Sequence, residues 1–93
     1  MRSTRPELDH LLLKLEEFRR SAIGVDELQK VLWGTAQGLS AHQDRKLREH
    51  LQDAEGRVEQ IRFTVDQSRA MGEIAVVVDA VAAVLRSELA PST

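Results

Sequence analysis

The chain of 93 residues contains three histidines, His10, His42 and His50, and the histidine side chain suits metal binding and proton transfer. Two histidines on a helix share one metal ion when they lie three or four residues apart, with a third ligand close by. His42 and His50 lie eight residues apart, about two helical turns, and the nearby Asp44 and Glu49 do not complete a site. We therefore expect surface histidines and no metal site.

The sequence carries no other arrangement that is typical of catalysis. It contains no cysteine, which excludes a cysteine nucleophile, a thiolate zinc site and a disulfide framework. Carboxylate pairs such as Glu55 and Glu59 occur on any charged helix, and no phosphate-binding glycine loop or nucleophile elbow is present. We expect a protein that is not an enzyme and that needs no cofactor and no small-molecule substrate.

One carboxylate, that of Asp79, lies within the most apolar stretch of the chain, GEIAVVVDAVAAVL at residues 72–85. Three interpretations stay open for it. Asp79 marks a solvent-exposed edge of its helix, or it is buried and paired with an arginine that fixes the packing register, or it contacts a cation of a partner protein. No companion base or nucleophile accompanies it, which argues against catalysis.

Charge and hydropathy argue against two further classes of function. The formal net charge is −2, with 13 basic and 15 acidic residues interspersed along the chain, so no basic face for nucleic acid stands out. Nucleic-acid binding would need a basic face that forms only when the chain folds. The apolar run 74–85 is far shorter than the roughly 20 residues of a membrane span, and residues 1–18 are too charged for a signal-peptide core. We expect a cytoplasmic protein.

The first half of the chain predicts two helices. Thr4 and Glu7 form a capping box that starts the first helix. Gly24 caps the second helix, which ends near Gly38, and Gly34 inside it indicates either the close approach of another backbone or a soft helix. The inner faces of the two helices are Leu8, Leu11, Leu12, Leu15, Phe18 and Ala22, and Leu28, Val31, Leu32, Thr35 and Leu39.

The second half predicts two more helices. Ser40 and Gln43 form another capping box, which starts a helix over residues 41–65, about 37 Å long. We expect a fourth helix from residue 69 or 73 to residue 89, with a strand over 73–78 as the alternative because β-branched residues favour sheets. The inner faces are the heptad seam Leu47, Leu51, Ala54, Val58, Ile61 and Val65, and Ile74, Val77, Val78, Val81, Val84 and Leu85.

These elements predict one domain over residues 4–90, with frayed ends at 1–3 and 91–93. The fold class is all-α. We expect a small, irregular antiparallel bundle of about four helices with a long third helix.

Large apolar residues lie off the inner faces of three helices. Leu13, Trp33 and Phe63 are candidate partner-binding residues, because aromatic and large apolar side chains anchor protein interfaces. The alternative is that they fill gaps between helices of an irregular bundle. On the fourth helix, Val76, Ala80 and Ala83 lie opposite the inner face and form a candidate oligomer interface.

We therefore expect a small non-catalytic module that binds another protein. Its roles include an adaptor, a regulatory subunit and a small inhibitor such as an immunity protein or an antitoxin. The alternative is a homo-oligomeric structural protein that self-associates through its third and fourth helices.

Overall fold

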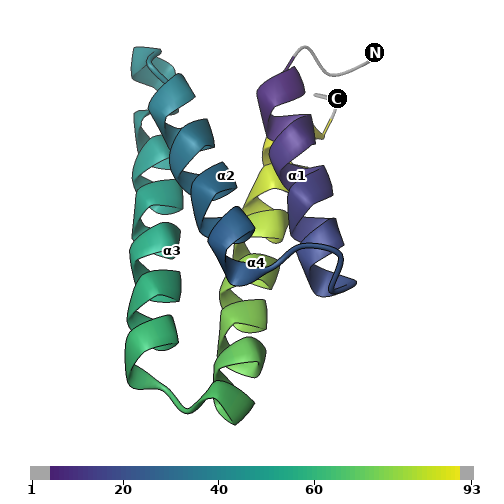
Figure 1. Ribbon diagram of the computed structural model, residues 1–93. Coiled ribbons are helices and arrows are strands. Elements are labelled where there is room, and N and C mark those ends of the chain that lie inside the picture. The colour runs from purple at the N-terminus through teal and green to yellow at the C-terminus, as the bar shows by residue number, and fades with distance from the viewer. Residues whose placement is uncertain (1–4, 91–93) are drawn as a thin grey trace.

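The computed structural model describes residues 5–90 (Figure 1). Within them lie four α-helices and one short 3₁₀ turn. They are α1 (Pro6–Arg19), α2 (Val25–Gly38), η1 (His42–Asp44), α3 (Arg45–Thr64) and α4 (Gln67–Leu89). Successive helices run in opposite directions, so the chain forms an up-and-down antiparallel bundle (Figure 1). The predicted all-α class and four-helix architecture are confirmed.

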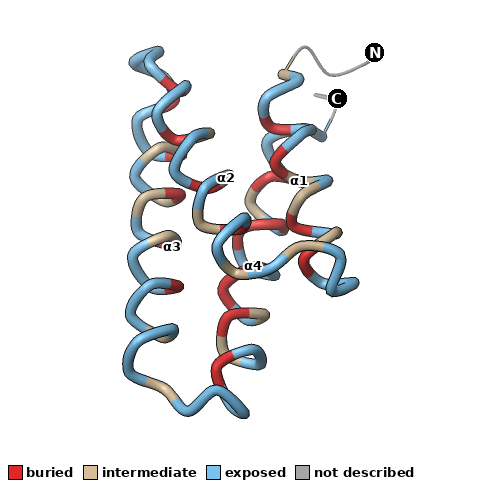
Figure 2. Tube along the Cα trace, viewed as in Figure 1, coloured by how far each residue is buried: buried red, intermediate tan, exposed pale blue. Residues whose placement is uncertain are grey.

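The helices are arranged as a closed ring. α1 packs against α2 and α4, and α3 packs against the same two helices. In the described part of the chain, no close backbone contact joins α1 to α3 or α2 to α4. The buried residues line the inside of this ring (Figure 2). A helix of the ring therefore buries one broad face and leaves the opposite face to solvent.

The core consists of aliphatic side chains from all four helices. Its most completely buried members are Leu8, Leu11, Leu15, Leu28, Leu32, Leu51, Val58, Ile74, Val78, Val81 and Leu85. Each of them belongs to an inner face that the helical spacing predicts. Some predictions at the margins differ. Ala36, Ala70 and Ala82 are buried although the spacing left them out, and Ala22 is exposed because α1 ends before it.

The boundaries of α1 and α2 agree in part with the predicted caps. Gly24 is the N-cap of α2 and has an extended conformation, and α2 ends at Gly38, as predicted. α1 begins at Pro6 after Arg5 and has no side-chain capping hydrogen bond. Thr4, the expected cap, lies outside the described residues.

The predicted capping box of Ser40 and Gln43 is wrong. Residues 42–44 form the turn η1, and α3 begins four residues later than expected, at Arg45. The reason is Asp44, which is buried, with a carboxylate oxygen 2.9 Å from Nη2 of Arg5. The turn points Asp44 inward, where the pair joins the start of α1 to the start of α3.

The same pair affects the titration of Arg5. Partial burial opposes the charged form, but hydrogen bonds and electrostatic attraction from Asp44 and Glu7 outweigh it, and they raise the pKa of the Arg5 guanidinium. Nearby, Nη1 of Arg48 donates a hydrogen bond of 2.8 Å to the backbone carbonyl of Leu39, just past the end of α2. These contacts fix one end of the bundle.

α4 is continuous through residues 73–78, so the alternative of a strand there is wrong. Ile74, Val77 and Val78 are buried at helical spacing against the core, which overrides their intrinsic preference for sheets. α4 begins at Gln67 with Asp66 as its N-cap. Within residues 5–90, none of the helices has the length and apolarity to cross a membrane.

The helices differ in length, and this creates an open end. α1 and α2 each have 14 residues, whereas α3 has 20 and α4 has 23. α1 ends at Arg19, whose Nε lies 3.1 Å from Oδ1 of Asp79, so the part of α4 before Asp79 extends past α1. Figure 1 shows α3 and α4 projecting below the shorter pair. We call this the open end of the bundle.

Candidate functional site

Five large hydrophobic side chains among the described residues are exposed although the core is well packed. Their exposed fractions are 48% for Leu13, 49% for Trp33, 75% for Phe63, 46% for Met71 and 69% for Val76. Single exposed apolar residues are common and need no explanation. The question is whether any of them lie together on a surface that could bind a partner.

The three predicted partner-binding residues do not form one patch. Leu13 lies on α1 and Phe63 on α3, and these two helices occupy opposite corners of the ring. Trp33 lies on α2, between those corners. Phe63 is the second-last residue of α3 and therefore lies at the open end. Partner binding by these residues stays a prediction. Phe63 lies at the same end of the bundle as the pocket described next, but it does not line that pocket.

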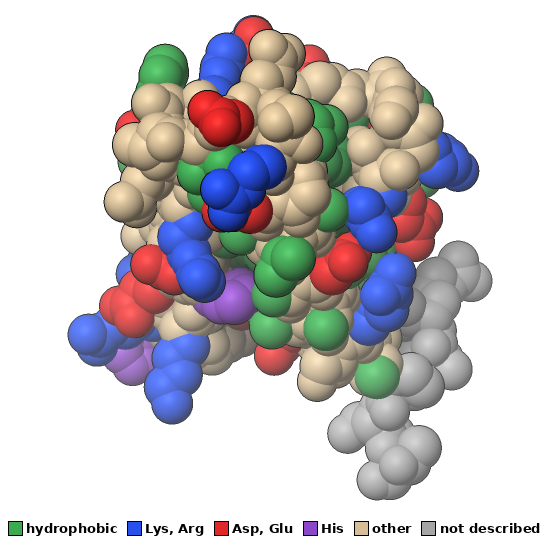
Figure 3. All heavy atoms as spheres, turned by 90° about the horizontal axis from the view of Figure 1, so that it is seen from below, with side chains coloured by type: hydrophobic (Ala, Val, Ile, Leu, Met, Phe, Trp, Pro, Cys, Tyr) green, Lys and Arg blue, Asp and Glu red, His purple; other side chains and the backbone are tan. Residues whose placement is uncertain are grey.

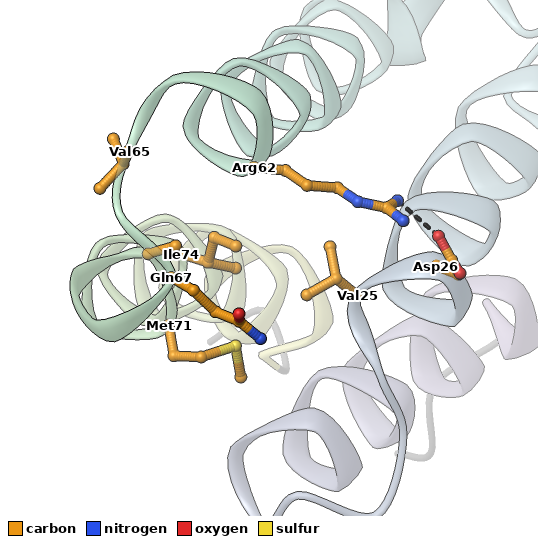
Figure 4. A pocket seen from close by; sticks show the side chains of 8 residues that line it. Val25, Asp26, Arg62, Val65, Gln67, Met71 and Ile74 are labelled. Atoms are coloured by element: carbon orange, nitrogen blue, oxygen red, sulfur yellow. Dashed lines mark ion pairs between the residues drawn. The ribbon is translucent and has the colours of Figure 1, made fainter.

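A pocket of about 380 Å³ lies at the open end, between the first turn of α2, the end of α3 and the first turns of α4 (Figure 4). Val25 faces Ile74 and Gln67 across it (Figure 4). The lining residues are Val25, Asp26, Arg62, Val65, Gln67, Ala70, Met71 and Ile74. α1 ends before it reaches this level, so three helices surround a space that four helices would fill.

One wall of the pocket is held in place by a polar network around Arg62. Its guanidinium forms an ion pair with Asp26 (Figure 4) and donates a hydrogen bond of 2.7 Å to Oε1 of Gln29. Gln29 in turn donates a hydrogen bond of 3.1 Å to Oε2 of Glu55. The guanidinium carbon also lies 5.6 Å from the centre of the Phe63 ring. Arg62 therefore connects the exposed Phe63 to the rim of the pocket.

The open end combines apolar and charged side chains on one face (Figure 3). Figure 3 views it directly and shows hydrophobic side chains near its middle, with Lys, Arg, Asp and Glu side chains around them. Interfaces commonly combine an apolar centre with a polar rim. Met71 and Phe63 supply exposed apolar surface, and the pocket between the helices can accept a side chain of a partner.

The predicted oligomer residues lie on a second surface. Val76, Ala80 and Ala83 are all exposed on the outer face of α4. Next to Val76, a groove of about 300 Å³ runs between α3 and α4. Its lining residues are Arg57, Gln60, Ile61, Glu73, Val76 and Val77. The helical wheel therefore placed these side chains on the correct face, and their role in assembly stays a prediction.

Asp79 lies on the side of α4 that faces α1. Its side chain is 60% exposed and pairs with Arg19, which is also half exposed. The interpretation of a buried aspartate is therefore wrong, and the solvent-exposed edge is confirmed. A neighbouring exposed pair joins Arg86 to Glu16 at 3.8 Å. Such exposed pairs contribute little to stability because water screens them.

Gly34 has no close neighbour within the chain. A Cβ atom added there would meet nothing within 4 Å, so no backbone of the bundle approaches it. The interpretation that another backbone of the chain approaches Gly34 closely is therefore wrong. The remaining interpretation is that Gly34 lowers the stability of α2. It lines a shallow groove between α1 and α2 together with Pro6, Glu7, His10, Val31, Thr35 and Gly38.

The titratable side chains of residues 5–90 include no group that could hold a metal ion. Among residues 5–90, no three His, Cys, Asp or Glu side chains are placed to hold one metal ion. His10 and His42 are exposed on different helical elements. His50 is half-buried, and its Nε2 is buried without a hydrogen-bond partner. The polar groups at the pocket are the Arg62–Asp26 pair and the amide of Gln67.

Sequence reasoning missed the pocket and Met71. The residues that line the pocket come from the starts of α2 and α4 and from the end of α3. The helical spacing of apolar residues is analysed within each of these segments and says nothing about their distance from one another. One signal was available: Val65 ends the heptad seam directly before a break in the helical pattern. An apolar residue at such a break indicates that the end of a helix is still packed against something.

Comparison with known proteins adds no functional information. No protein-family model matches the chain, and neither the curated proteins nor the solved structures include a significant match.

Proposed function

We propose that this protein is a non-catalytic module that binds another protein at the open end of its bundle, as an adaptor, a regulatory subunit or a small inhibitor. One observation carries the proposal. Phe63 is three-quarters exposed at the same end of the bundle as a pocket of about 380 Å³, whose lining is mainly apolar. Aromatic side chains next to a preformed pocket are typical anchors of protein interfaces.

The arrangement supports a binding mode in which a partner inserts one apolar side chain into the pocket. Val25, Ile74 and Met71 would contact that side chain, and Phe63 would pack against the surface around it. Arg62 already contacts Asp26 and Gln29, so part of this wall is ordered before binding. Pre-ordered walls reduce the entropy lost on association.

The size of the open end favours a modest interface. The molecule measures 43 × 25 × 19 Å along its principal axes, so the end presents a face of 25 by 19 Å. This is about 60% of the roughly 800 Å² that each partner buries in an interface of standard size. We therefore propose a transient contact dominated by a few anchors. We place it in the cytoplasm, since the chain contains no cysteine.

The experiment is affinity isolation of the tagged protein from its native cells, in the wild type and in two variants. Phe63→Ala removes the proposed anchor, and Leu13→Ala removes an exposed apolar residue on the opposite corner of the ring. We expect one stoichiometric partner, which is retained by Leu13→Ala. Phe63→Ala should weaken its binding by about 2 kcal/mol or more, roughly 30-fold in Kd.

Calorimetric titration with the purified partner then measures the affinity, and circular dichroism checks that both variants stay folded. A partner that is lost in Leu13→Ala but retained in Phe63→Ala would place the binding surface elsewhere. Absence of any stoichiometric partner would contradict the proposed function.

A further inference from the structure

We propose that a second copy of this chain docks on the outer face of α4, over Val76, Ala80 and Ala83. We call these three residues the outer stripe. All three are exposed, and Val76 keeps 69% of its surface accessible. The two alanines allow another backbone to approach closely. This surface shares no lining residue with the pocket at the open end, so the proposal does not depend on the proposed function.

The groove next to the outer stripe provides both apolar surface and charge. Ile61 and Val77 line it, together with Val76 of the stripe. Arg57 lies on the α3 wall and Glu73 on the α4 wall. Among residues 5–90, Arg57 takes part in no ion pair, and Glu73 pairs only with the exposed Arg69 of its own helix, at 3.7 Å. Both charges are thus available to a docked molecule.

The opposite charges on the two walls select a second copy as the occupant. A two-fold axis parallel to the groove exchanges the α3 wall with the α4 wall. Arg57 of one copy then lies opposite Glu73 of the second copy, and the same pair forms again on the other side of the axis. Such a self-complementary surface is what an isologous dimer requires. A partner with a single sign of charge would be repelled by one of the two walls.

The side of the molecule that carries the outer stripe would reach the area of a standard dimer interface if nearly all of it were buried. The long side measures 43 Å by at least 19 Å. That reaches the roughly 800 Å² that each partner buries in an interface of standard size. The net charge of −2 adds little repulsion between two copies.

The test is sedimentation equilibrium of the purified full chain over concentrations from about 1 to 200 µM. We expect a dimer of twice the 10.4 kDa chain mass. Ala80→Arg should weaken dimerisation at least tenfold, because a long charged side chain on the outer face of α4 would hold the second copy away from that helix. Arg57→Glu and Glu73→Arg should each weaken it at least threefold, and the double variant should recover most of the loss. Circular dichroism checks that each variant is folded.

Leu13→Ala is the matched control, because it removes an exposed apolar side chain on α1, outside the outer stripe and the groove, and should leave the dimer unchanged. A monomeric wild type at 200 µM would overturn the proposal and leave partner binding at the open end untouched. Dimers that resist Ala80→Arg, or a double charge swap that recovers nothing, would equally overturn it.

Discussion

The substitution Gly34→Ala tests whether any contact within the chain requires a glycine at this position of α2. Gly34 lies inside α2, is exposed, and has open space where a Cβ would stand. Glycine costs about 0.8–1.0 kcal/mol relative to alanine within a helix, because it loses more backbone freedom on folding. No clash offsets this difference. We therefore expect Gly34→Ala to raise the free energy of unfolding by up to about 1 kcal/mol.

For a domain of this size, a gain of 1 kcal/mol corresponds to an increase of roughly 4–8 °C in Tm. Urea and thermal unfolding followed by far-ultraviolet circular dichroism measure both quantities. Gly24→Ala is the matched control, because Gly24 is the N-cap of α2 and alanine is a poor cap. That control should gain no stability. A loss of stability in Gly34→Ala would refute the reasoning, because it would require a close neighbour that the bundle does not show.

Two further predictions concern an ion pair and the single tryptophan. Asp44→Ala should lower the free energy of unfolding by about 2 kcal/mol, because it removes the ion pair between the buried Asp44 and the partly buried Arg5. Asp79→Ala, at an exposed pair, should cost less than about 0.5 kcal/mol. Urea unfolding distinguishes them, and equal losses would contradict the assignment. Trp33→Ala should change stability little, because half of that side chain is exposed. If Trp33 also anchors a partner, the same variant should weaken binding by about 2 kcal/mol or more in calorimetric titration. A variant that does not fold would show instead that Trp33 belongs to the core.

The sequence alone determined the fold class and most of the core. Leu8, Leu11 and Leu15 recur at three- and four-residue spacing, and so do Val78, Val81 and Leu85. Such spacing places apolar side chains on one helical face, which must be buried whatever its neighbours are. The same argument placed Phe63 and Val76 on the outside, because a residue opposite a buried face is exposed in a ring of four helices.

Local signals were less reliable at helix starts. Ser40 and Gln43 have the types and spacing of a capping box, yet α3 begins at Arg45. The deciding contact is the pair of Asp44 with Arg5, which lies 39 residues earlier in the chain. The capping-box pattern depends on only four neighbouring residues, so it contains no information about a contact with a residue of another helix.

The open end and its pocket were decided by the tertiary structure. Their existence depends on where α1 ends relative to α4, which the pair of Arg19 with Asp79 marks in space. The pocket residues come from three segments whose separation in the sequence carries no information about their distance in the fold. Periodicity specifies which face of each helix is buried, whereas the relative height of the helices follows from how their side chains interlock, and that height decides which apolar residues stay uncovered.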